Sequence, residues 1–337
     1  MTITTPKVPP PGVWAPAITF FNHSNDELDN ESQSKYYHYL STTGLAGLVI
    51  LGTNAETFLL TREERKTLLT TARESVGPGF PIMAGVSGHS TKQVLEFISD
   101  AKDAGANYAL LLPPGYFGKQ STMDVVRGFY GYIAERSELP LVIYNFPAVV
   151  NGVDIDSATI AELARKYDNI VGVKLTCGSV AKITRLSAEF PSEEERGGGA
   201  GGERRFAAYA GQSDFLIGGL AAGGAGTIAG FANVFPRTIV RIYELYTQGR
   251  VKEAMELHKT AALAEQPCKA GIASVKYAAS FTTARRAGVE GAEGKLRPRR
   301  PYKELDEMGK RGVREGIEAL MGIEEALEAQ FNGNGVK

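Results

Sequence analysis

The chain has 337 residues, of which 43% are hydrophobic and 22% charged, so it can bury a large core and is not broadly disordered. Its 37 Lys and Arg residues balance its 38 Asp and Glu residues, and the net charge is −1. This balance provides no basic field for nucleic acid and no general attraction to anionic membranes, so we expect neither as a partner.

The cysteines and histidines are too few for a disulfide framework or a metal cluster. There are 2 cysteines, Cys177 and Cys268, and 4 scattered histidines. No run of about 18 apolar residues is present, so no membrane span is expected. The N-terminal residues have neither the apolar core of a secretion signal nor the arginines of a typical transit peptide. We expect a reducing, cytoplasmic location and leave a mitochondrial one open.

Two segments are predicted to lack regular secondary structure. The prolines of residues 1–12 disfavour a helix or a strand ladder, which predicts a disordered tail. Residues 191–205 are rich in glycine and charge, which predicts a flexible insertion, most simply a solvated loop without function.

Short β-branched or apolar runs recur along the first two-thirds of the chain and predict eight strands. They are Val13–Phe21, Ala46–Leu51, Pro81–Val86, Asn107–Leu112, Leu141–Phe146, Asn169–Leu175, Phe206–Ala210 and Gly224–Ala229. Most intervals between them show the helical period; Thr61 and Glu64 form a capping-box pattern, and Ser90 begins another helix. Eight strand–helix units predict an α/β fold, a (β/α)8 barrel over residues 13–235, with an open doubly wound sheet as the alternative.

The last third of the chain is helical in pattern. Residues 238–248, 251–265 and 270–285 have the helical period, and Gly249 is placed to end a helix. These helices exceed what a barrel needs for closure, so we predict a C-terminal helical region over residues 236–337.

A lysine in the sixth predicted strand requires an explanation. Side chains alternate between the two faces of a strand. Val173 then faces the helices, whereas Lys174 points into the barrel, where Gly172 leaves room. Burying an unpaired ammonium is costly, and a buried free amine is a nucleophile toward carbonyl carbon. The alternatives are a lysine that reaches solvent from the strand end or one paired with a carboxylate.

Two other predicted strands end in groups that could serve the same chemistry. Tyr144 is placed inside the barrel, where a phenol could move protons or could simply pack. Thr53 and Asn54 lie in a turn that could hold a carboxylate through backbone N–H groups, although most such turns bind nothing. Glu56 follows this turn and is expected to brace it.

Several motifs follow these strands in a fixed order. They are G-T-N-A-E at 52–56, Y-N-F-P at 144–147, G-V-K-L-T at 172–176, A-G-Q-S-D at 210–214, G-G-A-G-T-I at 223–228 and V-K-Y-A at 275–278. Together they resemble the dihydrodipicolinate synthase/N-acetylneuraminate lyase family, from about residue 11 to residue 305. The resemblance implies a Schiff-base (class I) aldolase built as a (β/α)8 TIM barrel with extra C-terminal helices, and a homotetramer arranged as a dimer of dimers.

The resemblance also implies catalytic roles. Lys174 matches the Schiff-base lysine, Tyr144 the catalytic tyrosine and Thr53 a hydroxyl of the proton relay. Tyr116 matches a tyrosine that family members lend to a neighbouring subunit's site.

Four residues match substrate contacts. Thr53 and Asn54 match the turn that binds the pyruvate carboxylate. Ile228 matches an apolar residue of the pyruvate pocket, and Thr176 a hydroxyl near the far end of the substrate.

Departures from the family pattern select among its activities. Val149 stands where dihydrodipicolinate synthases have an arginine that binds aspartate semialdehyde. Ala55 replaces a glycine of the family, so the backbone at Ala55 must avoid positive φ or bear strain. The segment of residues 144–154 resembles fungal 4-hydroxy-2-oxoglutarate and 2-keto-3-deoxy sugar-acid aldolases. We therefore expect cleavage of a 4-hydroxy-2-oxo acid to pyruvate and an aldehyde. Dihydrodipicolinate synthase-type condensation and a non-catalytic barrel that binds 2-oxo acids are the alternatives.

No cofactor is expected. The glycines at 224–230 are spaced wrongly for a dinucleotide fingerprint, and no acidic residue follows about twenty residues later. The expected partner is a small 2-oxo acid.

Overall fold

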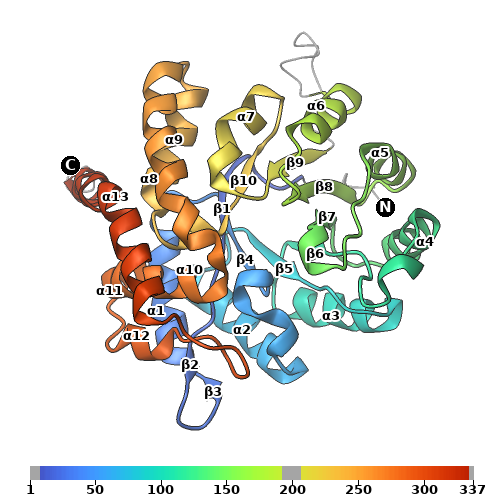
Figure 1. Ribbon diagram of the computed structural model, residues 1–337. Coiled ribbons are helices and arrows are strands. Elements are labelled where there is room, and N and C mark those ends of the chain that lie inside the picture. The colour runs from blue at the N-terminus through green and yellow to red at the C-terminus, as the bar shows by residue number, and fades with distance from the viewer. Residues whose placement is uncertain (1–7, 192–205, 334–337) are drawn as a thin grey trace. The chain divides into compact units, whose positions relative to one another are not determined.

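A computed structural model describes residues 8–191 and 206–333 (Figure 1). Its longer strands are β1 (Gly12–Pro16), β4 (Gly47–Ile50), β5 (Ile82–Gly85), β6 (Tyr108–Leu111), β7 (Leu141–Asn145), β8 (Ile170–Leu175), β9 (Ala207–Ala210) and β10 (Gly226–Ile228). They follow the order β1-β10-β9-β8-β7-β6-β5-β4 in a closed barrel. All eight predicted strands are present, and the predicted (β/α)8 barrel is confirmed.

The first predicted strand, Val13–Phe21, is longer than the observed one. After β1 the backbone is satisfied by side chains instead of a strand partner: the Ile18 N–H donates to Asn233 Oδ1 (3.3 Å) and the Phe20 N–H to Gln33 Oε1 (3.0 Å). Phe21 instead opens a two-stranded hairpin of β2 (Phe21–Asn22) and β3 (Glu27–Leu28), which the sequence analysis missed.

Helices occupy the intervals between the strands and the C-terminal third. They are α1 (Asn30–Ser41), α2 (Arg62–Val76), α3 (Thr91–Asp103), α4 (Met123–Ala134), α5 (Ser157–Lys166), α6 (Val180–Glu189), α7 (Leu216–Ala221), α8 (Pro236–Thr247), α9 (Val251–Glu265), α10 (Ile272–Phe281), α11 (Thr283–Arg286), α12 (Ala292–Lys295) and α13 (Glu307–Gly333). The capping box of Thr61 and Glu64 is confirmed, as is the N-cap at Ser90, which accepts from the Gln93 N–H.

The chain forms two compact units. One contains residues 81–228 with residues 8–11, and the other residues 12–80 with residues 229–333. The boundary predicted between residues 235 and 236 stays a prediction, and the insertion predicted at 191–205 falls on residues 192–205, which lie outside the described residues.

The unit of residues 81–228 contains the strands β5 to β10, and each of them pairs in parallel with the next strand along the chain. Each of its helices from α3 to α7 packs on the next along the chain. The segment just before β1 is also held in this unit, since the Tyr209 hydroxyl donates to the carbonyls of Pro9 (2.7 Å) and Pro10 (2.9 Å). The predicted tail of residues 1–12 otherwise falls mainly on residues 1–7, outside the described part.

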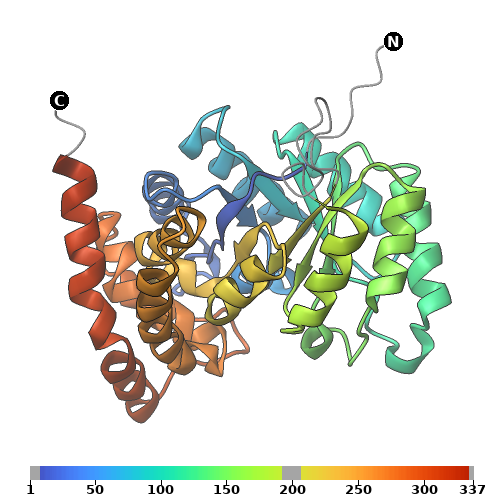
Figure 2. The same ribbon diagram turned by 90° about the horizontal axis from the view of Figure 1, so that it is seen from above.

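The other unit pairs β1 with β4 and contains the C-terminal helices. Helix α13 packs against α8 and α9, beside which it runs in Figure 2. The Glu324 carboxylate of α13 is buried and accepts the first N–H groups of α8, from Arg237 (2.9 Å) and Thr238 (2.8 Å). The first N–H groups of a helix have no acceptor within the helix, so Glu324 satisfies two of them and joins α13 to α8.

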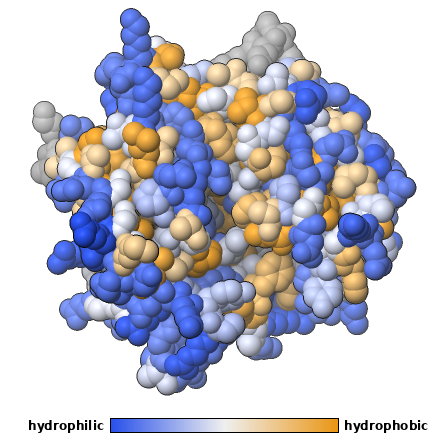
Figure 3. Space-filling view, in the orientation of Figure 1, coloured by the Kyte–Doolittle hydropathy of each residue, from blue (hydrophilic) through white to orange (hydrophobic). Residues whose placement is uncertain are grey.

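Polar and apolar residues are interspersed on the face in Figure 3. None of the described helices is both long and apolar enough to cross a membrane.

Candidate active site

Lys174 of β8 and Tyr144 of β7 are side by side. They are register partners in the parallel pair, and Lys174 Nζ lies 4.3 Å from the centroid of the Tyr144 ring. Both residues are only 3% exposed. No acidic side chain of the described chain forms an ion pair or hydrogen bond with Lys174. Lys174 therefore neither reaches bulk solvent nor sits in a carboxylate pair, the two alternatives that its sequence context left open.

The structure explains the need for glycine at position 172 differently from the sequence analysis. A Cβ at this position would lie 2.6 Å from the carbonyl oxygen of Ala207 in β9. The glycine thus lets the backbones of β8 and β9 approach, and it is not explained by space for the lysine.

Thr176 follows β8 on the same face as Lys174, two residues further along. Its backbone N–H donates to the Asn145 carbonyl (2.9 Å), but its Oγ1 is buried and has no hydrogen-bond partner among the described residues. A Cβ on Gly211 would lie 2.1 Å from this oxygen, so only glycine fits there. A buried hydroxyl without a partner is costly, and it can donate to or accept from a ligand.

The loop after β7 is closed at its base by a polar network. Asn145 is fully buried; its Nδ2 donates to Asp154 Oδ1 (2.7 Å) and its Oδ1 accepts from the Ile155 N–H (2.9 Å). The Lys182 ammonium pairs with the same Asp154 carboxylate and donates to the Ile155 carbonyl (2.8 Å). These contacts join both ends of the loop directly beside Tyr144.

Tyr116 lies in the loop after β6 and is 70% exposed. Its ring packs edge-on against His89 (centroids 5.7 Å apart) and against Phe117 (5.1 Å), which is 69% exposed. Two adjacent exposed aromatic rings form an apolar surface that a single chain leaves uncovered.

The turn of Thr53 and Asn54 belongs to the other unit, where it follows β4 as a short 3-10 helix (Thr53–Ala55). Positive φ angles occur at Leu51 (64°) and Glu56 (58°), but Ala55 has none. The backbone therefore meets the expectation for Ala55 by placing the left-handed residue one position later.

Glu56 is held by charge and hydrogen bonding within the same unit. Its Oε1 accepts from the Lys276 ammonium at 2.6 Å and its Oε2 from the Arg299 N–H at 2.7 Å. Burial lowers the pKa of Lys276, and the Glu56 carboxylate counteracts part of that effect. The expected bracing role of Glu56 is thereby confirmed in its geometry.

Ile228, the last residue of β10, is fully buried. The Thr227 hydroxyl before it donates to the Ala210 carbonyl (3.0 Å), which holds the ends of β9 and β10 together.

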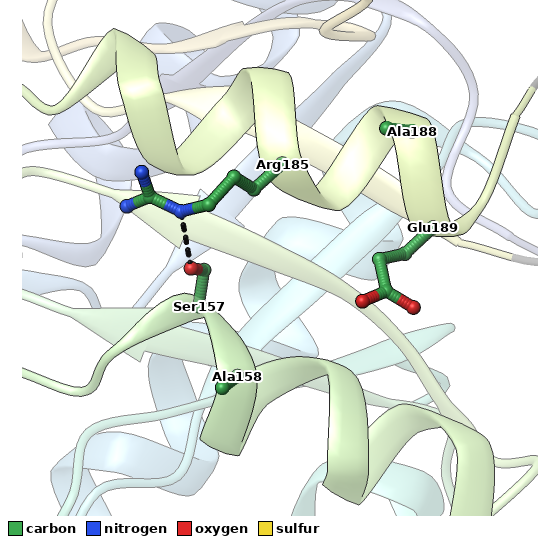
Figure 4. A pocket seen from close by; sticks show the side chains of 5 residues that line it. All are labelled: Ser157, Ala158, Arg185, Ala188 and Glu189. Carbon is green, nitrogen blue, oxygen red and sulfur yellow. Dashed lines mark hydrogen bonds between the residues drawn. The ribbon is translucent and has the colours of Figure 1, made fainter.

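A surface hollow between α5 and α6 is separate from these groups (Figure 4). There Arg185 Nε donates to Ser157 Oγ (2.7 Å), and the other lining residues are Ala158, Ala188 and Glu189. None of the candidate catalytic residues lines it.

The sequence analysis missed Asn145 and Asn151 as polar contacts of the loop after β7. Asn145 belongs to a quoted motif but looks like one more strand residue. Asn151 precedes Gly152, and the Asn-Gly pair is a turn signal that could have directed attention to it.

A closed parallel barrel with a buried lysine and a tyrosine on adjoining strands near their carboxyl ends is the arrangement of a barrel enzyme whose amine meets a carbonyl substrate. The model of the dihydrodipicolinate synthetase family matches residues 9–320. The chain belongs to this family.

Relatives support the assignment over nearly the whole length. A Coccidioides immitis protein, provisionally named a mitochondrial 4-hydroxy-2-oxoglutarate aldolase, is 58% identical over 96% of this chain and 99% of its own. The L-threo-3-deoxy-hexylosonate aldolase of Hypocrea jecorina is 35% identical over 94% of this chain and 98% of its own. A crystal structure of a Coccidioides immitis protein provisionally assigned to the dihydrodipicolinate synthase family superposes with a TM-score of 0.86 at 55% identity, covering 96% of this chain and 99% of the other.

Proposed function

We propose that this protein is a lyase, a class I aldolase that cleaves a 4-hydroxy-2-oxo acid to pyruvate and an aldehyde. The observation that carries the proposal is the buried Lys174 amine beside the Tyr144 ring, with no carboxylate of the described chain paired to it. Two relatives are named as aldolases, one provisionally of 4-hydroxy-2-oxoglutarate and one of L-threo-3-deoxy-hexylosonate, and these names point to the substrate class.

In the proposed reaction, Lys174 Nζ attacks the 2-oxo carbon and forms a carbinolamine. Tyr144 donates the proton with which water leaves, giving a protonated imine. The imine accepts the electron pair of the C3–C4 bond as the Tyr144 phenolate takes the proton of the C4 hydroxyl, which releases the aldehyde and leaves an enamine. Protonation at C3 and addition of water then release pyruvate and restore the lysine.

The remaining roles follow from the family resemblance. Thr53 supplies the relay hydroxyl, and Thr53 with Asn54 binds the pyruvate carboxylate. Ile228 lines the pyruvate pocket. Thr176, whose buried Oγ1 has no partner among the described residues, binds a polar group of the aldehyde portion.

An assembly of several copies fits the exposed aromatic surface at Tyr116 and Phe117. Val125 and Tyr132 of the neighbouring α4 are also exposed, at 46% and 45%. We propose a homotetramer, a dimer of dimers, in which Tyr116 reaches the site of a second copy. We also propose a mitochondrial location in place of the cytoplasmic one first expected, because the Coccidioides immitis relative is named as mitochondrial.

Condensation with aspartate semialdehyde is the weaker candidate. Val149 is 43% exposed in the loop after β7 and offers no cation to a second carboxylate. Turnover of 4-hydroxy-2-oxoglutarate and of 2-keto-3-deoxy sugar acids should therefore exceed condensation of pyruvate with aspartate semialdehyde. Faster condensation would reverse the assignment, and absence of both activities would favour a non-catalytic barrel that binds 2-oxo acids.

A further inference from the structure

Asn151 connects the loop after β7 to the loop that contains Tyr116. Its Nδ2 donates to the carbonyl oxygens of two consecutive residues, Gly115 at 2.7 Å and Tyr116 at 3.2 Å. One amide group thus uses its two hydrogens on the backbone that precedes and includes the tyrosine.

The backbone of Asn151 is shaped for this contact. Its φ is 52°, in the left-handed region that asparagine tolerates better than most residues. Gly152 follows with φ 82° and donates its N–H to the Pro147 carbonyl (2.9 Å), which closes the turn. The side chain is therefore presented by a defined turn.

The two loops are also in direct backbone contact. A Cβ on Gly115 would lie 2.6 Å from both Cα and Cβ of Val150, so no other residue fits without moving one loop. Val150 is buried, and Val149 beside it occupies the position that distinguishes this chain from dihydrodipicolinate synthases. A shift of the loop after β7, which contains Val149 and Val150, would thus be transmitted to Tyr116.

We infer that Asn151 is a positioning residue that fixes the backbone of Tyr116 relative to the loop of Val149 and Val150. This inference rests on the proposed function, because it gives Tyr116 its catalytic role. Since the base of the same loop is fixed by Asn145 and Asp154, its tip is the part whose position depends on Asn151.

The test is a double-mutant cycle of Asn151→Gly and Tyr116→Phe. Glycine keeps the left-handed backbone conformation available and removes the side chain that carries the amide. With Tyr116 present, Asn151→Gly should lower kcat for pyruvate release by about three- to tenfold, as expected for the loss of two hydrogen bonds, one part-buried and one exposed, that hold a reacting group. In the Tyr116→Phe background the same change should have almost no further effect, because residues that act through one another are not additive.

Asn169→Ala is the matched control. Asn169 precedes β8, and its Nδ2 donates to the Ala134 carbonyl at 2.8 Å, so its loss removes a similar bond at the opposite end of the strand from Lys174. It should change the melting temperature and leave kcat unchanged. If Asn151→Gly folds poorly, Asn151→Asp provides the same test. It turns carboxylate oxygens toward the same carbonyl oxygens, and it should lower kcat to a similar extent.

Equal effects of Asn151→Gly in both backgrounds, no effect in either, or full activity of Tyr116→Phe would overturn the inference while leaving the aldolase assignment intact. Absence of pyruvate release by the unmodified protein would instead refute the proposed function, and the inference with it.

Discussion

Lys276 Nζ lies 2.6 Å from Glu56 Oε1, with the two side chains 0% and 4% exposed. The pair joins α10 to the turn after β4, and Lys276 also donates to the Arg297 carbonyl at 3.0 Å. This buried lysine is fully engaged by its partners, in contrast to Lys174, and its position explains how the left-handed Glu56 is held at the end of the turn of Thr53 and Asn54.

Removing one charge of this pair should be strongly destabilising. Lys276→Met leaves a buried carboxylate without its counter-ion, and the free energy of unfolding in urea should fall by about 3–5 kcal/mol. The double variant Glu56→Gln with Lys276→Met should recover part of this loss. A loss below about 1 kcal/mol for Lys276→Met would show that the pair does not hold the turn.

Tyr144→Phe should reduce turnover without a comparable loss of stability. Removing a general acid–base group costs about a hundredfold or more in rate. Tyr36→Phe is the matched control: its buried hydroxyl donates to the Asn233 carbonyl at 3.0 Å, so its loss should lower the free energy of unfolding by about 1 kcal/mol and leave kcat nearly unchanged. Similar rates for both variants would remove Tyr144 from the mechanism.

Val149→Arg should shift the protein toward condensation with aspartate semialdehyde. The position is exposed enough for a guanidinium to remain hydrated, so folding should be retained. A charge-assisted contact to the second carboxylate should raise kcat/KM for condensation by about tenfold or more. Val149→Leu, which adds bulk without charge, should not. An equal response of the two variants would mean that charge at this position does not select the substrate.

Stability should depend on pH through Glu324. Burial raises the pKa of this carboxyl above the usual 4.5, although donors from Arg237 and Thr238 counteract the effect. The folded protein then binds the proton more tightly than the unfolded chain, so this group lowers the free energy of unfolding as the pH rises from about 4.5 to the raised pKa.

Glu324→Gln should abolish this contribution and flatten the pH dependence in that interval by up to about 1.4 kcal/mol per pH unit. The exposed Glu318→Gln on the same helix should leave the slope unchanged. Denaturation midpoints measured at several pH values check this, and identical slopes for wild type and Glu324→Gln would contradict it.

Local patterns were sufficient to predict the eight barrel strands and the facing of Lys174, because alternation and helical period are properties of neighbouring residues, but they did not predict the end of β1 or the β2–β3 hairpin. The pairing of Lys174 with Tyr144 followed from placing both on adjacent parallel strands. Glu56 and Lys276 are 220 positions apart, and nothing local indicates that two charges so distant will be buried together. Side-chain contacts between loops, such as that of Asn151 with Gly115, could likewise not be predicted, because the length of a loop does not define its conformation.

The most direct test of the central claim is reduction with borohydride in the presence of pyruvate, followed by peptide mass spectrometry. The imine predicts a reduced pyruvyl adduct on Lys174, absent from Lys174→Ala and absent without pyruvate, with Lys276 unmodified because it is buried in its ion pair. No adduct, or an adduct on another lysine, would contradict the account.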